Sequence, residues 1–181
     1  MLTTEEQERL IEGCRKGNRP AQEALYRAYY KPMASICLYY TKNQDEAVEV
    51  LNNGFLKVFQ NIKAYEPAQA SLYTWIRTLV IRSCLDFIRE KTKAEKHCEL
   101  NGAEINVPAD VVGKIKASEL LALVRSLPPA TAAVFNLYAI EGYNHKEIAE
   151  LLDISTGTSK WHLSEARKQL QQKIKMQDLH T

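Results

Sequence analysis

The sequence predicts an all-α protein of two small helical domains joined by a flexible linker, the second domain a helix-turn-helix. Apolar residues recur at three- and four-residue steps along almost the whole chain, and no long stretch alternates with the two-residue period of a strand. The stretch 91–116 breaks this pattern, because it is charged, lacks aromatic residues and contains two glycines and a proline. The length of 181 residues suits two small domains. We expect domains over 1–92 and 118–181, with the linker over 93–117.

Four amphipathic helices are expected in the first domain. The first ends near Gly17, and the second begins around Pro20, because proline suits the first turn of a helix. Pro32 should kink or divide the second helix, since proline removes one backbone hydrogen bond. The third helix spans 47–62, and Ser71 is placed to cap the fourth. The expected buried face of the fourth helix comprises Leu72, Trp75, Ile76, Leu79, Val80, Cys84, Phe87 and Ile88.

The second domain shows the order of elements of a helix-turn-helix. A short helix ends before Pro128, and the next ends at Gly142. Asn144 and Glu147 have the spacing of a capping box, which begins a third helix. After the turn 153–155 a longer basic helix follows, which completes the motif. The apolar positions expected in the helix before Gly142 are Val134, Phe135, Tyr138 and Ile140.

Composition places the chain among folded proteins outside the membrane. It is 45% hydrophobic and 25% charged, and 24 basic against 22 acidic residues leave a net charge of +2, so any charge that binds nucleic acid must be local. The first residues lack the basic and apolar parts of a signal peptide. The most apolar stretch, 72–88, is interrupted by Arg77, Arg82 and Asp86. We therefore expect a cytoplasmic protein with no membrane insertion.

The sequence offers little chemistry for catalysis or metal binding. The four histidines form no H-x-x-x-H pair, and neither a phosphate-binding glycine loop nor a nucleophile–base grouping stands out. The four cysteines lack C-x-x-C spacing, so buried or incidental thiols are favoured over a metal or redox site at His97 and Cys98. We expect no enzymatic activity, no metal and no cofactor.

The last helix has two dissimilar faces. With Leu163 at the centre of the buried face, Ala166 and Leu170 fall on the same side. From 155 to 175 there are five basic residues and one acidic residue. Basic groups can hold phosphates while other side chains reach base edges in a major groove, so this helix is predicted to bind DNA. The alternative is a solvated helix whose Trp161 contacts another domain. The outward residues are Trp161, Ser164, Glu165 and Lys168, with Lys160, His162 and Arg167 on the flanks.

The third helix carries one apolar residue on a polar outer face. Leu56 lies among Glu49, Asn52 and Asn53, and an apolar residue framed by acids and amides suggests a surface that docks a partner. The alternative is a single exposed leucine, which needs no role.

The fourth helix carries a basic outer stripe. It lies beside the loop 61–71, and the two surfaces could follow a DNA strand or hold unstacked bases. The alternative is a charged, solvated face. Trp75 shares the spacing of the core positions, so a core role is favoured over base stacking. The stripe comprises Thr78, Arg82, Arg89 and Lys93, with Arg77 adjacent.

Motifs in the first domain resemble two helices of one protein family. The stretch 46–59, EAVEVLNNGFLKVF, is similar to the core-polymerase-binding helix of sigma factors. The stretch 70–77, ASLYTWIR, which continues to DFIR at 86–89, resembles the sigma helix that melts and reads the minus-ten promoter element.

Motifs of the same family follow in the second domain. Leu127-Pro-Pro and the stretch 141–152 resemble the start of the domain that binds the minus-thirty-five element, and 157–160 with 166–170 resemble its recognition helix. Two sets of motifs in the right order identify the chain as a member of the extracytoplasmic-function subfamily of sigma-seventy factors.

The resemblance implies a role for each domain. The first would dock on the clamp helices of the largest polymerase subunit and open the minus-ten DNA, and the second would read the minus-thirty-five element as duplex. The implied partners are core RNA polymerase, promoter DNA and an anti-sigma factor. The implied polymerase-binding residues are Glu49, Asn52, Asn53 and Leu56. The implied minus-ten residues are Arg77, Thr78, Arg82 and Arg89. The implied minus-thirty-five residues are Lys160, Trp161, His162, Ser164, Glu165, Arg167 and Lys168.

The sequence departs from the family pattern at four positions. Arg82 stands where asparagine is usual, Asn53 where an acid is usual, Glu165 in place of a common arginine, and Trp161 in place of a small residue. These departures leave the expected fold and general role intact, and they bear on the promoter sequence.

Two rival functions make different predictions. A stand-alone regulator that uses only the C-terminal helix-turn-helix, with the first domain as a sensor or dimer module, would bind specific duplex DNA without polymerase. A protein-interaction module would have no DNA affinity at any salt concentration.

Overall fold

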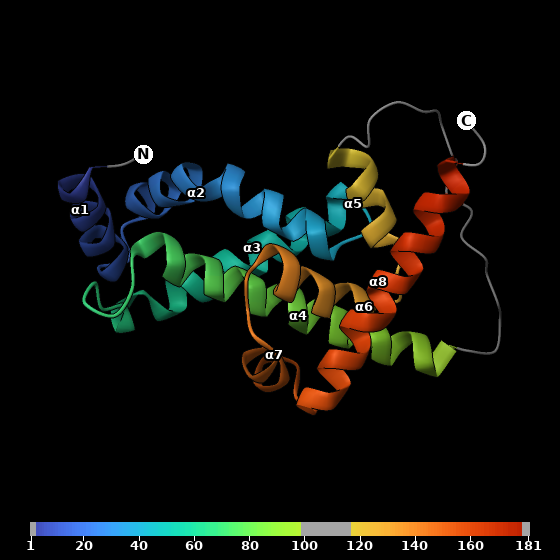
Figure 1. Cartoon of the computed structure of the whole chain (residues 1–181). Helices are drawn as coiled ribbons and strands as arrows, with labels where there is room; N and C mark the ends of the chain where they lie inside the picture. Colours follow the sequence, from blue (N-terminus) through green and yellow to red (C-terminus); the bar gives the residue numbers. More distant parts are fainter. Residues whose placement is uncertain (1–2, 99–116, 179–181) are drawn as a thin grey trace. The chain divides into compact units, whose positions relative to one another are not determined.

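Every regular element is helical within residues 3–98 and 117–178, which the computed structural model describes (Figure 1). The all-α prediction is therefore confirmed. The chain packs as two units, Met1–Phe87 and Ile88–Thr181. The elements are α1 (Thr4–Arg15), α2 (Arg19–Tyr40), α3 (Gln44–Asn61), the 3₁₀ turn η1 (Ile62–Ala64), α4 (Leu72–Cys98), α5 (Ala117–Arg125), α6 (Pro129–Phe135), the π-helical turn η2 (Asn136–Ile140), α7 (His145–Leu152) and α8 (Thr156–Asp178).

Polar side chains cap the helices of the first unit. Asn18 and Asn43 each accept a hydrogen bond from the backbone N–H three residues further on, at 3.0 and 2.9 Å. Ser71 Oγ accepts one from the backbone N–H of Thr74 at 3.2 Å, as its predicted capping role requires. Such a cap contributes about 1 kcal/mol. The caps fix where α2, α3 and α4 begin, and therefore which side chains each helix exposes.

Pro32 does not divide α2, which runs unbroken from Arg19 to Tyr40. Met33 and Cys37, which follow the proline, are completely buried. Their packing offsets the one backbone hydrogen bond that proline removes, a loss of roughly 3 kcal/mol in an unsupported helix. Of the two outcomes predicted for Pro32, a kink or a division, the division is therefore wrong.

The core of the first unit lies between α2, α3 and α4. Gly54 is buried where α3 meets α4: a Cβ placed on it would lie 3.0 Å from Cγ2 and 3.2 Å from Cα of Val80. Glycine is therefore needed for the two helices to approach this closely. The largest completely buried side chains of α2 to α4 include Leu25, Met33, Leu51, Phe55, Leu72, Ile76, Ile81 and Leu85.

Helix α4 is longer than the sequence pattern predicts. It continues to Cys98, six residues into the stretch 93–117 that was expected to be linker, and α5 begins at Ala117. Lysine, alanine and glutamate predominate just after residue 90, and these residues favour a helix even where no apolar stripe marks one. The rest of the expected linker lies outside the described residues.

In the second unit, α5, α6 and α7 pack against α8. Leu123, Val124 and Leu127 form one buried cluster with Ala166 and Leu170 of α8. Around this cluster lie the partly buried Ala132, Phe135 and Ile174. The buried face predicted for the last helix is therefore confirmed.

The π-helical turn η2 carries two of the apolar positions that were expected in the helix before Gly142. Tyr138 and Ile140 lie on the surface, 37% and 42% exposed, whereas Asn136 and Leu137 are completely buried. In this turn the backbone oxygen of Asn136 accepts a hydrogen bond from the N–H of Glu141, five residues on, so a 3.6-residue period does not assign its faces. Tyr138 is thus a surface residue of the second unit.

Candidate nucleic-acid and partner-binding faces

The turn between α7 and α8 has the geometry that the sequence predicts. Asn144 Oδ1 accepts hydrogen bonds from the N–H groups of Lys146 and Glu147 at 2.9 and 3.1 Å, and Glu147 Oε2 accepts one from the N–H of Asn144 at 2.7 Å. This reciprocal pairing is a capping box. Asp153 then adopts a left-handed conformation, with φ of 55°, and Ser155 Oγ caps α8 through the N–H of Thr158 at 2.9 Å. The helix-turn-helix is thereby confirmed.

The outer face of α8 is basic and carries one large aromatic side chain. Lys160, Ser164, Arg167 and Lys168 are exposed, and Trp161 is 59% exposed. Leu163 on the opposite side is buried, so periodicity predicts this face correctly. Glu165, also among the predicted DNA-contacting residues, is half-buried and accepts a hydrogen bond from Gln169 Nε2 at 2.7 Å.

His162 lies against α6. It is half-buried, and its Nδ1 is 3.0 Å from the hydroxyl of Thr131, a buried residue. Burial lowers the pKa of His162 below its ordinary value of 6.5, because a charged imidazole loses hydration there. Its place against Thr131 gives His162 a packing role inside the unit.

The lowered pKa predicts that acid destabilises the second unit. The folded state holds His162 neutral more strongly than the unfolded chain does, so the stability that this contributes is fully present above about pH 6.5 and is lost as the pH falls through the folded-state pKa. We expect the melting temperature to fall in this window, and His162→Gln to flatten the fall. Thermal unfolding followed by circular dichroism at a series of pH values checks this. Identical profiles for the variant and the parent chain would contradict it.

A basic hollow of about 380 Å³ opens on the second unit beside α8. His145, at the start of α7, lies at this hollow, and its Nδ1 is 2.9 Å from the hydroxyl of the buried Ser159. No carboxylate is among the lining residues, so the hollow suits an anion. They are His145, Lys160, Leu163, Ser164, Arg167, Lys168 and Gln171.

The face predicted on α3 is exposed. Glu49, Asn52 and Asn53 all face solvent, and Leu56 is 56% exposed among them. Asn52 Oδ1 accepts a hydrogen bond from the Tyr26 hydroxyl at 2.8 Å, so α2 holds this amide in place. The apolar residue in a polar surround, which the sequence predicts, is present.

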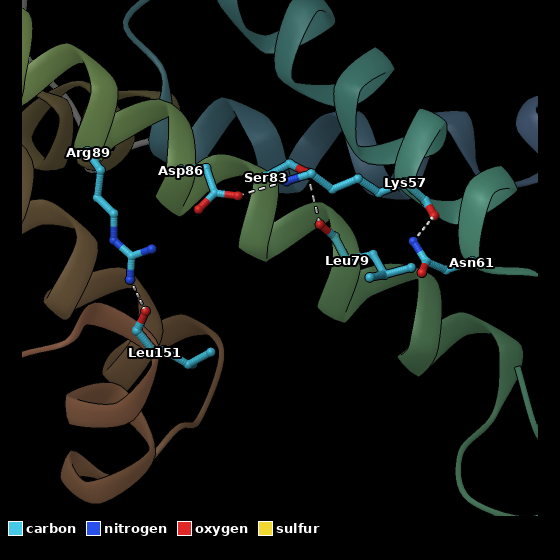
Figure 2. Close-up of polar contacts among 7 residues, drawn as sticks. All are labelled: Lys57, Asn61, Leu79, Ser83, Asp86, Arg89 and Leu151. Atoms are coloured by element: carbon cyan, nitrogen blue, oxygen red, sulfur yellow. Dashed lines mark hydrogen bonds and ion pairs between the residues drawn. The ribbon is translucent and has the colours of Figure 1, made fainter. Parts of the chain in front are cut away.

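Ion pairing fixes α3 to α4 beside that face. Lys57 Nζ pairs with Asp86 Oδ2 at 2.7 Å, and the backbone oxygen of Lys57 accepts a hydrogen bond from Asn61 Nδ2 at 2.8 Å (Figure 2). Both side chains of the pair are part-exposed, so its stabilisation is modest, under about 1 kcal/mol.

The predicted basic stripe on α4 is only partly exposed. Arg82 is exposed, whereas Arg77 and Thr78 are half-buried, and the Thr78 hydroxyl donates to the backbone oxygen of Thr74 at 2.9 Å. Arg89 belongs to the second unit, in which its guanidinium donates to the backbone oxygen of Leu151 (Figure 2). The side chain of Lys93 lies outside the described residues.

The loop between η1 and α4 is tied down at its start. Tyr65 is buried, its ring centre lies 5.1 Å from that of the half-buried Trp75, and its hydroxyl donates to the backbone oxygen of Ala70 at 3.0 Å. Arg15 Nη2 donates to the backbone oxygen of Tyr65 at 2.7 Å. Sequence periodicity does not identify this arginine, because the contact joins residues 50 positions apart.

The cysteines that the structure describes are buried thiols. Cys14, Cys37 and Cys84 are free and buried, as predicted, and the Sγ atoms of Cys37 and Cys84 are 3.9 Å apart. Burial raises the pKa of Cys84 well above its ordinary value, which disfavours the reactive thiolate. The side chains of His97 and Cys98 lie outside the described part. Among the helices described, none is long and apolar enough to cross a membrane.

Comparison with known proteins identifies the two units. The sigma-70 region 2 family matches residues 25–94, and the sigma-70 region 4 family matches residues 117–170. The extracytoplasmic-function (ECF) RNA polymerase sigma-E factor of Haemophilus influenzae is 20% identical over 178 residues, which cover 91% of this chain and 93% of that protein. The chain belongs to the ECF sigma factors of the sigma-70 family.

Further relatives agree with this assignment. The RNA polymerase sigma-H factor of Pseudomonas aeruginosa is 20% identical over 181 residues, which cover 93% of each chain. The sigma factor RpoE of Bartonella quintana, solved in complex with the anti-sigma factor NepR, has the same fold: the TM-score is 0.57 at 14% identity, over 84% of this chain and 96% of that one.

The positions at which this sigma factor departs from the family pattern are mostly on the surface. Asn53, Arg82 and Trp161 are exposed, and Glu165 is half-buried. None of the four belongs to the buried core, which explains why the departures are compatible with the fold.

Proposed function

We propose that this sigma factor binds core RNA polymerase through α3 and directs initiation at promoters that α4 and α8 recognise. The observation that carries this is the succession, on one chain, of region 2 and region 4, each with an exposed face of the expected chemistry. Glu49, Asn52, Asn53 and Leu56 are the proposed polymerase contacts.

The proposed division of DNA recognition follows helices α4 and α8. Arg77, Thr78, Arg82 and Arg89 on α4 would contact the minus-ten element, and melting would be driven by tighter binding of unstacked bases than of duplex. Lys160, Trp161, Ser164, Arg167 and Lys168 on α8 would contact the minus-thirty-five duplex. His162 and Glu165 would contact the duplex only from the edge of this face, since both are half-buried.

The polymerase supplies the bond-making chemistry in this proposal. The sigma factor contributes binding energy and sequence recognition, and it needs neither catalytic residues nor a cofactor. Its place of action is the cytoplasm, where bacterial RNA polymerase works.

An anti-sigma factor is a further proposed partner. The support is the solved relative from Bartonella quintana, whose structure contains the anti-sigma factor NepR. The exposed faces of α3 and α8 are the surfaces that such a partner would have to cover in order to prevent use of the sigma factor.

A stand-alone helix-turn-helix regulator is the rival that the first unit disfavours. Such a regulator has no use for a region 2 fold, yet residues 25–94 match region 2. A protein-interaction module without DNA affinity is disfavoured by the basic hollow beside α8.

Reconstitution tests the proposed function directly. The full chain is mixed with core polymerase, the complex is isolated by size-exclusion chromatography, and run-off transcription is measured on a library of promoter fragments. We expect a stable complex and transcripts from a subset of fragments. Binding to duplex without polymerase, with no effect on transcription, would favour the stand-alone regulator. A chain that binds neither would be a protein-interaction module.

A further inference from the structure

An exposed tyrosine holds two basic side chains on the second unit. The ring of Tyr138 stacks on the imidazole of His145, with ring centres 4.8 Å apart and planes 25° from parallel. Cζ of Arg167 lies 5.9 Å from the centre of the same ring. The three side chains come from η2, α7 and α8, so the stack joins three separate elements.

Tyr138 is exposed, and other residues of the same turn supply the side chains that fill the core. In η2, Asn136 and Leu137 supply the buried side chains, and Tyr138 keeps 37% of its area exposed. The backbone oxygens of Asn136 and Leu137 accept hydrogen bonds from the N–H groups of Glu141 and Tyr143, both at 2.9 Å, which fixes this turn. π-Helical turns of this kind occur frequently at functional sites.

Both basic partners of Tyr138 line the hollow beside α8. His145 and Arg167 lie there together with Lys160 and Lys168, and no carboxylate lines it. The Nδ1 atom of His145 bonds to Ser159, so an anion in the hollow would meet the Nε2 edge of the ring. The hollow, of about 380 Å³, has room for a phosphate group.

We propose that Tyr138 is a positioning residue, whose ring holds His145 and Arg167 ready to bind one backbone phosphate of the promoter duplex. This inference rests on the proposed function of α8. A guanidinium is attracted to the face of an aromatic ring. An arginine ordered in this way loses less rotamer entropy when it binds phosphate than a free one does. The hydroxyl of the tyrosine takes no part in this, because the ring face makes the contacts.

Salt-dependent binding of the holoenzyme to a promoter duplex tests the role. For Tyr138→Ala we expect affinity to fall about three- to ten-fold. The slope of log affinity against log salt should decrease by about one unit, because one phosphate contact is lost. Tyr138→Phe keeps the ring and should bind as the parent chain does. Ile140→Ala removes a side chain of the same turn with similar exposure, 42% against 37% for Tyr138, and is the matched control.

The salt slope separates positioning from a general loss of structure. A weaker Tyr138→Ala holoenzyme with an unchanged slope, or a Tyr138→Phe holoenzyme as weak as Tyr138→Ala, would overturn the inference. In a double variant with Arg167→Ala, the loss of affinity should be smaller than the two single losses combined, since the ring acts partly through that guanidinium and partly through His145. Fully additive losses would also overturn it.

Two further measurements are needed. One separates failure of this inference from failure of the proposed function of α8, and the other separates DNA phosphate from free phosphate as the ligand. Lys160→Ala should lower promoter affinity in the same assay. If it does so and Tyr138→Ala does not, the present inference fails and the function of α8 stands, whereas no effect from either variant would remove the proposed function itself. Inorganic phosphate is titrated against the chain at constant ionic strength. If phosphate binding depends on Tyr138 while Tyr138→Ala leaves promoter affinity unchanged, the hollow is a free-anion site and the assignment to the DNA backbone is overturned.

Discussion

Leu56→Asp is expected to weaken binding to core polymerase by about 30-fold or more, equivalent to about 2 kcal/mol for loss of a central contact. Leu56 is 56% exposed, so its replacement removes little packing within the unit. The carboxylate would instead be buried against the partner with no cation provided for it, which is costly. Fluorescence anisotropy of labelled sigma factor, titrated with core enzyme, measures the change.

A matched control separates position from charge in this experiment. Tyr73 is also a large exposed side chain of the first unit, at 43%, and it lies on α4, whereas Leu56 lies on α3. Tyr73→Asp should leave core affinity within about two-fold, since exposed substitutions outside an interface cost little. Asn52→Ala is a milder probe of the same face. Equal core affinity of the Leu56→Asp variant and the parent chain, with helicity preserved, would exclude the α3 face.

Helix type and helix faces could be predicted from the sequence because both are local properties. The spacing around Leu163 identifies a face that is indeed buried, and the Asn144–Glu147 spacing identifies a capping box that indeed forms. The same reasoning places Leu56 on an exposed face of α3. Each of these outcomes depends on residues within two helical turns of one another.

The errors arise where packing or backbone register overrides the local pattern. Pro32 was expected to kink or divide α2, but the helix is not divided, and burial of Met33 and Cys37 supports its continuity. Tyr138 and Ile140 were expected as apolar positions of a regular helix, but both lie in a π-helical turn and are exposed. A period of 3.6 residues does not assign the faces of such a turn.

The candidate faces show the same division between local and distant causes. Exposure of Lys160, Trp161 and Leu56 follows from periodicity. The attachment of His162 to Thr131, 31 residues away, does not, and neither does the stack on Tyr138. Contacts between separate helices depend on how the helices pack, which a single sequence pattern does not specify.

Substitutions at Lys160 and Trp161 should change promoter binding in two different ways. Lys160 is exposed on α8 and should act mainly through phosphate. Its loss should weaken binding to all sequences alike and lower the salt slope by about one unit. Trp161 carries no charge, and its indole can cover a thymine methyl group or a sugar edge. Trp161→Ala should reduce discrimination at one base pair by about 1–3 kcal/mol, or about 5- to 150-fold, with little change in salt slope.

The alternative for Trp161 is a packing role, which the exposure of its side chain disfavours. The indole is 59% exposed, and its ring centre lies 4.8 Å from that of His162. Loss of so exposed a side chain should cost under about 0.5 kcal/mol of stability. Melting temperature and holoenzyme binding to a panel of single-base promoter variants are therefore measured together. A destabilised Trp161→Ala protein with unchanged base preference would assign the tryptophan to packing, whereas altered preference at one base pair with unchanged melting assigns it to recognition.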